Sequence, residues 1–302
     1  METNPYNADA PVSYAEMWFG ASECIKWMQM KIAGELIDWL PYVCKKYLHR
    51  KDGSFLVLGA GDSSIVRSLR EAGYTGYIVA TDIAEKGLKR LKADVCAAGF
   101  DNIDYVVADL NTYDFQYTFD TIISQGVLHH VEQTDRCLAM LKRNLAPNGF
   151  LIAEEYIGAI RFQLPEAQVA WINAALNVLP KDLRPFQKEP EMLRPATAAE
   201  NARVYYVAPT EESILAYDPS EAIVGPALNH SLTRLFKVVE RTGYGGTLLS
   251  YMTGHFDFKR SNTDPFALAW LKVLMQIEDT LIETGILTDE FVFYVLQSPN
   301  TH

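Results

Sequence analysis

Glycines and carboxylates in the first third of the chain have the spacing of a nucleotide-like binding site. A short apolar run leads directly into Leu58-Gly59-Ala60-Gly61-Asp62-Ser63, and a helical pattern follows. Glycines there let the backbone turn tightly and let a ligand approach the main chain, although a plain strand-to-helix turn has the same composition. Asp82 lies 23 positions beyond Gly59, where a carboxylate can accept hydrogen bonds from ribose hydroxyls. Asp109 ends the next apolar run and could accept from an adenine amino group.

Two histidines and two glutamates further along could move a proton. His129 and His130 follow a later apolar run, and an imidazole that titrates near neutral pH is a candidate general base. Capping of a helix, or packing beside a ligand, is the alternative for this pair. Glu154 and Glu155 end the next run, where alternation sends their side chains to opposite faces, so at most one is expected to face a ligand. The predicted catalytic residues are His129, His130 and Glu155.

Other polar side chains could bind a second, small-molecule ligand. Arg161 and Gln163 follow the glutamates, and a guanidinium offers a bidentate fork to a carboxylate or phosphate, although a surface salt bridge is an equal alternative. Tyr156 and His255 are the other predicted substrate-binding residues. The segment Asp218-Pro219-Ser220-Glu221-Ala222 has the pattern of a helix start, with an aspartate cap and a proline at the first helical position.

Alternating strands and helices are expected to position these residues. Apolar runs separated by amphipathic helical patterns predict a parallel sheet with crossover helices. In open sheets of this kind ligands gather at the carboxyl ends of the strands. The predicted strands lie at residues 55–58, 77–81, 103–108, 119–124, 150–153, 235–240 and 291–296.

Helical additions flank this sheet on both sides. A helical pattern covers residues 13–50, where Pro41 is expected to interrupt it, and another covers 266–286. The chain divides into an N-terminal helical segment (1–52), a ligand-binding core (53–157), a helical insertion that forms a substrate lid (158–234) and a C-terminal part of the core with strands six and seven and a helical insertion (235–302). A homodimer interface is the alternative for the additions, because it has the same amphipathic signature as a lid.

Composition excludes several kinds of partner. The net charge of −11 repels a phosphate backbone, so no nucleic acid is expected. The four cysteines lie far apart without a metal-binding or disulfide pattern, which favours a reducing cytoplasm and no metal. Residues 1–14 lack the regions of a secretory signal, and no apolar run reaches the ~18 residues of a membrane span. We expect a cytoplasmic protein that acts on a small molecule.

The order of these features resembles the class I S-adenosylmethionine (SAM)-dependent methyltransferases. The most diagnostic part is Phe119-Asp120-Thr121-Ile122-Ile123-Ser124-Gln125-Gly126-Val127-Leu128-His129-His130, and the resemblance covers about residues 54–155. It implies an α/β fold with a Rossmann-like, seven-stranded, mostly parallel sheet whose last strand is antiparallel. It also implies SAM as the cofactor, bound by Gly59, Ala60, Gly61, Asp62, Ser63, Asp82, Ile83, Asp109, Leu110, Gln125 and Gly126.

Two positions depart from the pattern of that family. Val57 stands where an acidic residue is common, and Ser63 stands where a third glycine is common. Ser63 is small enough to permit close approach, and Asp62 could replace part of the missing carboxylate. Residues 154–158, 161–163, 218–222 and 244–249 are also similar to segments of one group of bacterial small-molecule methyltransferases. The resemblance implies methyl transfer to an oxygen or nitrogen nucleophile of a small molecule.

Two other functions use some of the same residues. A nicotinamide-dependent oxidoreductase would bind its dinucleotide through Gly59, Gly61 and Asp82, but it requires a third glycine at position 64, where this chain has Ser64. A protein that binds SAM without transferring methyl groups, as a regulatory module or a rearrangement enzyme, is the other alternative, because a fold alone does not fix a function.

Overall fold

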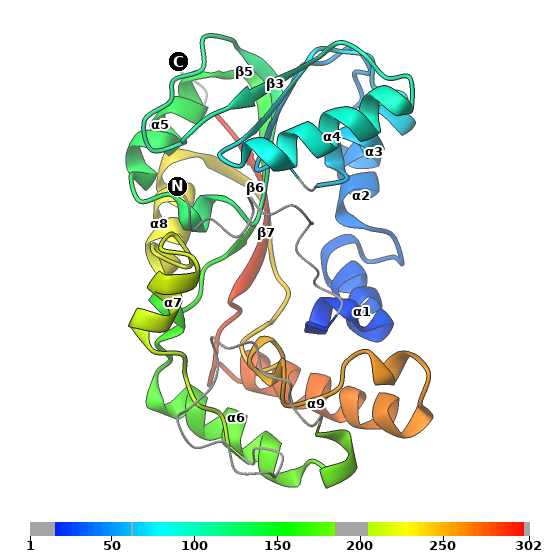
Figure 1. Ribbon diagram of the computed structural model, residues 1–302, viewed down its shortest axis with the longest axis vertical. Coiled ribbons are helices and arrows are strands. Elements are labelled where there is room, and N and C mark those ends of the chain that lie inside the picture. Colours follow the sequence, from blue (N-terminus) through cyan, green and yellow to red (C-terminus); the bar gives the residue numbers. More distant parts are fainter. Residues whose placement is uncertain (1–15, 62, 185–204, 299–302) are drawn as a thin grey trace.

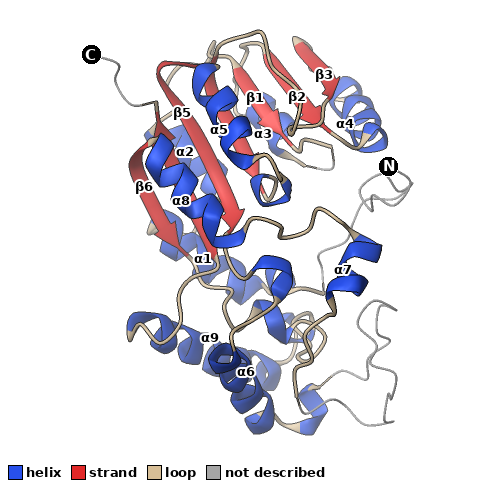
Figure 2. Cartoon of the chain, turned by 90° about the vertical axis from the view of Figure 1, so that its left-hand side faces the viewer, coloured by secondary structure: helices blue, strands red, loops and turns tan. Residues whose placement is uncertain are grey.

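One seven-stranded sheet forms the centre of the protein. The computed structural model describes residues 16–61, 63–184 and 205–298, and within them the strand order is β3-β2-β1-β4-β5-β7-β6 (Figures 1 and 2). Strands β1 to β5 run parallel, whereas β7 runs antiparallel to β5 and β6. This arrangement confirms the expected Rossmann-like fold. The strands are β1 (Phe55–Leu58), β2 (Ile78–Asp82), β3 (Ile103–Val107), β4 (Phe119–Gln125), β5 (Leu145–Tyr156), β6 (Lys237–Gly243) and β7 (Phe291–Gln297).

Helices cover both faces of the sheet, because its central strands are apolar on both sides. Val57, Ile123 and Ile152 pack on the side of α1 to α4, and Leu56, Ile122 and Leu151 pack on the side of α5 and α8. Figure 2 places α5 and α8 in front of the sheet and α2 and α3 behind it. These helices are α1 (Ser22–Ala33), α2 (Trp39–Lys46), α3 (Ile65–Glu71), α4 (Glu85–Ala97), α5 (Thr134–Arg143) and α8 (Gly225–Leu235).

β5 starts earlier than the sequence predicts and contains an irregularity. Phe119 pairs with Leu145, but Thr121 pairs with Phe150, so the register shifts across the turn at residues 147–149. A Cβ at Gly149 would lie 2.8 Å from the Asp120 carbonyl oxygen, which explains why glycine follows the left-handed Asn148 there. The turn therefore lies inside the strand and sets the register of β5 on β4.

The N-terminal helical segment breaks at Gly34, not at Pro41. Gly34 has a φ of 71° and ends α1 in the left-handed conformation. Pro41 lies in the first turn of α2, where backbone N–H groups have no helical acceptor and a proline removes no hydrogen bond. The prediction that Pro41 interrupts the helix was therefore wrong. The beginning of the predicted helix, residues 13–15, lies outside the described residues.

Two helices lie below the sheet in Figure 1, α6 (Glu166–Val178) and α9 (Pro265–Glu283). A third, α7 (Glu211–Tyr217), lies on the left of that view between α8 and α6. Residues 185–204 of the expected insertion lie outside the described residues. None of the described helices has the length and hydropathy that crossing a membrane requires.

The segment at 218–222 is a turn and not the helix start that the sequence predicts. Asp218 Oδ1 accepts from the backbone N–H of Ser220 over 2.8 Å and from its hydroxyl over 2.6 Å, while α8 begins only at Gly225. The aspartate therefore caps a turn, and the prediction was wrong because turns and helix starts share this side-chain contact.

Candidate functional site

The glycine loop after β1 lies against the carboxylate of Asp82. The Gly61 N–H donates to Asp82 Oδ2 over 2.9 Å, and the Ala84 N–H donates to Oδ1 over 2.7 Å. A Cβ at Gly61 would lie 2.9 Å from Asp82 Oδ2 and 3.2 Å from the Cα of Gly87. The absence of a side chain at Gly61 therefore lets the loop approach the end of β2 this closely. Asp62, a predicted cofactor residue, lies outside the described residues.

Asp109 extends the same rim of the sheet. Its Oδ1 accepts from the backbone and side-chain nitrogens of Asn111, both over 2.9 Å. Because β3, β2 and β1 are neighbours, Asp109, Asp82 and the glycine loop follow one another along the carboxyl edge. Two carboxylates beside a loop in which Gly59 and Gly61 carry no side chain form a rim of the size and polarity that an adenosine requires.

These residues line a cavity of about 1620 Å³. Small-molecule pockets usually measure about 300–1,000 Å³, so this cavity can hold a cofactor and a second molecule together. Ala60 does not line it, because its side chain is fully buried and its N–H donates to the Thr81 carbonyl oxygen. The predicted cofactor residues in the lining are Gly59, Gly61, Ser63, Asp82, Ile83, Asp109, Leu110, Gln125 and Gly126.

A buried pair, His129 and Glu155, lies in another part of the same cavity. The short helix η3 (Leu128–His130) follows β4 and brings His129 Nδ1 within 2.9 Å of Glu155 Oε2. Glu155 Oε1 accepts from the backbone N–H groups of Val127 and Leu128. Burial alone would lower the pKa of His129, but the contact with Glu155 holds it above its ordinary value. Burial alone would raise the pKa of Glu155, but His129 and the other donors hold it below.

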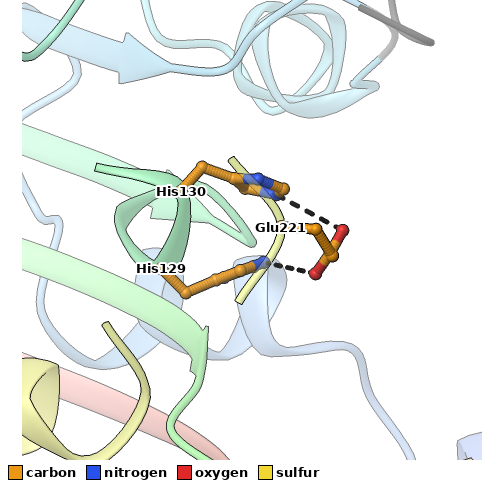
Figure 3. Close-up of side chains that lie close together, drawn as sticks. All are labelled: His129, His130 and Glu221. Carbon is orange, nitrogen blue, oxygen red and sulfur yellow. Dashed lines mark ion pairs between the residues drawn. The ribbon is translucent and has the colours of Figure 1, made fainter. Parts of the chain in front are cut away.

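His130 and Glu221 complete a cluster around His129 (Figure 3). Glu221 Oε1 lies 3.7 Å from His129 Nε2, and its Oε2 lies 4.0 Å from His130 Nε2. Burial and the neighbouring His129 lower the pKa of His130 to about 3, and burial raises the pKa of Glu221. Both separations exceed a hydrogen bond. A hydroxyl or amino group of a ligand could therefore lie between the imidazoles and the carboxylate.

Sequence reasoning missed Glu221 as a site residue. The turn that carries it is tied to η3, since the Ile223 N–H donates to the His129 carbonyl oxygen and Ser220 Oγ lies 3.2 Å from His130 Nδ1. Glu221 is 91 positions from His130, and its local pattern indicated only a helix start. The similarity of this segment to small-molecule methyltransferases was the signal that could have found it.

Both Glu154 and Glu155 line the cavity, although at most one was expected to face it. Their side chains do point to opposite faces, because Glu155 contacts His129 while Glu154 accepts from Tyr244 and Gln125. The expectation was wrong because the cavity lies over the strand ends and so reaches both faces of the sheet.

Aromatic side chains form the wall beyond His129. Tyr156 lies with its ring centroid 6.0 Å from that of His129, and its hydroxyl is 3.0 Å from the hydroxyl of Tyr251. Tyr206 packs against Tyr251 and His255. Tyr156 and His255, both predicted to bind the substrate, line the cavity. This wall suits a small organic molecule with apolar surface.

Arg161 and Gln163, the other predicted substrate-binding residues, are not brought into the lining. Arg161 Nη1 donates to the backbone carbonyl of Glu221 over 3.1 Å, and Gln163 Nε2 donates to the carbonyls of Arg161 and Pro209. The side-chain nitrogens of Arg161 and Gln163 therefore stabilise neighbouring backbone, including the backbone of Glu221, and do not face the cavity.

Part of the chain is similar in sequence to known methyltransferases. Residues 56–153 match the family model described as a methyltransferase domain. The ubiquinone/menaquinone biosynthesis C-methyltransferase UbiE of Escherichia coli is 33% identical over 125 residues, which cover 41% of this chain and 48% of that protein. The chain thus spans about half the length of the curated relatives it matches.

Two solved structures share the fold over most of the chain. A coclaurine N-methyltransferase bound to N-methylheliamine and S-adenosylhomocysteine (SAH) has a TM-score of 0.50 and 10% identity, over 96% of this chain and 89% of that chain. The [4+2]-cyclase SpnF has a TM-score of 0.50 and 10% identity, over 86% and 79%. At this identity the likeness concerns the fold alone. Residues 56–153, about a third of the chain, are thus similar to a methyltransferase domain, and the strand order agrees with that similarity.

Asp82→Ala is expected to weaken SAM binding by roughly 1–3 kcal/mol, the cost of losing a charged hydrogen-bond acceptor for the ribose. Isothermal titration calorimetry with SAM measures this directly. Asp52→Ala, which removes an exposed carboxylate whose ion pair within the described part of the chain is with Arg50, is the matched control and should leave the affinity unchanged. An Asp82→Ala protein that binds SAM as tightly as the wild type would contradict the ribose assignment.

Proposed function

We propose that the protein transfers the methyl group of SAM to an oxygen or nitrogen nucleophile of a small molecule. The His129–Glu155 pair, in the same cavity as Asp82 and Asp109, is the observation that carries this proposal. The cofactor rim alone would fit any SAM-binding protein. A buried imidazole held by a carboxylate additionally meets the need of a hydroxyl or ammonium nucleophile to lose a proton.

Positioning is the first contribution of the chain to this reaction. Bound SAM supplies an electrophilic methyl group for an in-line displacement. Asp82, Asp109 and the glycine loop fix the adenosine end, while Tyr156 and the aromatic wall exclude water from the acceptor. A nucleophile that is held close and shielded from water reacts through a lower barrier than one in solution.

Proton removal is the second contribution, and we assign it to His129 Nε2. Glu155 holds Nδ1, so that Nε2 faces the cavity. The negative charge of Glu155 also stabilises the imidazolium that forms when His129 takes the proton. His130, whose pKa is lowered to about 3, is a much weaker base than His129. Glu221 accepts a hydrogen bond from the nucleophilic group of the substrate, and its carboxylate places a second negative charge beside the imidazolium.

Transfer of label tests the proposal. The protein would be incubated with methyl-labelled SAM and the small-molecule fraction of a host extract, and labelled products would be separated by chromatography. The proposal expects label in a small molecule. No label in that fraction, despite demonstrated SAM binding, would contradict it and favour a SAM-binding module or a rearrangement enzyme; a [4+2]-cyclase shares this fold.

Thermal shift separates SAM from a nicotinamide cofactor. A ligand that binds the native state raises the melting temperature by an amount that increases with its affinity and concentration. SAM and SAH are expected to raise it, whereas NAD is not.

The proposed setting of the protein is the cytoplasm, which is supported by its four free cysteines.

Methyl transfer is expected to persist after treatment with a chelator. His129, His130 and Glu221 are residue types that bind divalent cations, and their ligand atoms lie within 4.8 Å of one another. We nevertheless expect turnover without a metal, because the His129–Glu155 pair already supplies the base that the proposed reaction requires. Turnover would be measured before and after EDTA and dialysis. A loss that an added divalent cation restores would contradict this expectation.

A further inference from the structure

The Glu154 carboxylate lies on the cavity wall. The side chains that donate hydrogen bonds to it are neutral, and the charged side chains near it are acidic. Its Oε1 accepts from the Tyr244 hydroxyl over 2.9 Å, and its Oε2 accepts from Gln125 Nε2 over 2.7 Å. The charged groups that act on it are Glu155 and Asp38, both acidic. Among the described residues, no ion pair joins Glu154 to a lysine, arginine or histidine. Burial raises its pKa, so a cation in the cavity would relieve an unfavourable charge.

The position of Glu154 along the rim indicates which part of the cofactor it would meet. The carboxyl edge carries Asp109 after β3, Asp82 at the end of β2 and the glycine loop after β1, and the next strand in this order is β4. Gln125 ends β4 beside Glu154, and the Gly126 N–H donates to the Glu154 carbonyl oxygen. Neighbouring strands lie about 4.8 Å apart, so the end of β4 is roughly 10 Å from Asp82. An amino-acid chain that starts at the ribose and passes the glycine loop extends toward Gln125 and Glu154.

We propose that Glu154 binds the ammonium group of the amino-acid part of SAM. This inference rests on the proposed function, since it takes the ribose to lie at Asp82. It also explains how the chain manages without an acidic residue at position 57, where Val57 is fully buried in the core. The carboxylate comes from the end of β5, and Gln125 and Tyr244 fix its orientation with one hydrogen bond to each oxygen.

Paired ligands make the test specific. SAH carries the ammonium group, whereas 5′-methylthioadenosine has the same adenosine and sulfur but no amino-acid part. Glu154→Gln keeps the size of the side chain and removes its charge. We expect the variant to bind SAH at least about tenfold more weakly than the wild type, and 5′-methylthioadenosine with unchanged affinity, both by calorimetry. Unchanged binding of the second ligand also shows that the variant is folded.

Two variants serve as controls. Asp82→Ala should weaken both ligands, because both contain the ribose. Glu290→Gln removes another buried carboxylate, which accepts from Gln168 and Tyr251 and does not line the cavity, and should leave both affinities unchanged.

Three results would overturn the inference. Equal SAH affinity of Glu154→Gln and wild type would show that the ammonium group lies elsewhere. Tighter SAH binding by the variant would show that the cofactor's carboxylate, and not its ammonium group, faces Glu154. A wild-type protein that binds no SAH at all would contradict the proposed function and with it this inference.

Discussion

His129→Ala is expected to lower turnover at saturating SAM by roughly 100- to 10,000-fold, the range for loss of a general base. The substitution removes Nε2 from the cavity but leaves Asp82 and the glycine loop intact. SAM affinity should therefore stay within about twofold of the wild type. The rate would be measured with the acceptor that labelling identifies, and SAM affinity by calorimetry.

His130→Ala is the matched control for this prediction, because it removes the adjacent imidazole from the same short helix. Its rate should fall less than about tenfold, since His130 has a lowered pKa and is a weak base. If His129→Ala loses less than tenfold, proton removal belongs to another group or to water.

The pH profile provides an independent readout of the same assignment. A base acts only in its neutral form, and the contact with Glu155 holds the pKa of His129 above the ordinary value of 6.5. The wild-type rate should therefore rise with pH and level off at a higher pH than a histidine with the ordinary pKa would give. The residual rate of His129→Ala should lack this rise.

Glu155→Gln is expected to lower turnover by about 100-fold or more, with little change in SAM affinity. The amide oxygen can still accept from the backbone N–H groups of Val127 and Leu128, so the turn after β4 keeps its shape. An amide, however, carries no charge to stabilise an imidazolium, and its NH₂ group can stabilise the wrong tautomer of His129. Single-turnover kinetics with prebound SAM would measure the chemical step.

Ser124→Ala is the control for Glu155→Gln. The Ser124 hydroxyl donates to Glu155 Oε1, so the substitution removes one hydrogen bond to the carboxylate but leaves its charge and its contact with His129. A loss below about tenfold is expected, which corresponds to a hydrogen bond of up to about 1.5 kcal/mol. Equal effects of the two substitutions would mean that packing, and not the charge of Glu155, matters.

The parallel core was predictable because its signals are local. Each strand from β1 to β4 is a short apolar run, and Asp82 and Asp109 follow from the rule that ligands meet the carboxyl ends of such strands. The alternation of Glu154 and Glu155 was also a local property, and their side chains do part to opposite faces. The sequence did not reveal that one cavity reaches both.

The acceptor side was poorly predictable because it is assembled from distant segments. Glu221 meets His129 only because the turn at 218–222 is bonded to η3, a contact between residues about 90 positions apart. Arg161 had the chemistry of an anion-binding residue, but its guanidinium donates to the Glu221 backbone instead. Side-chain type alone does not decide between such roles, since the partners are set by tertiary packing.

A crystal structure of the protein with SAH would show the cofactor, His129 and Glu221 together. We expect the ribose hydroxyls to contact Asp82, the adenine to lie beside Asp109, and the sulfur to face the space between His129 Nε2 and Glu221. SAH bound away from the carboxyl edge of β1 and β2, or with its sulfur directed away from His129, would contradict this expectation.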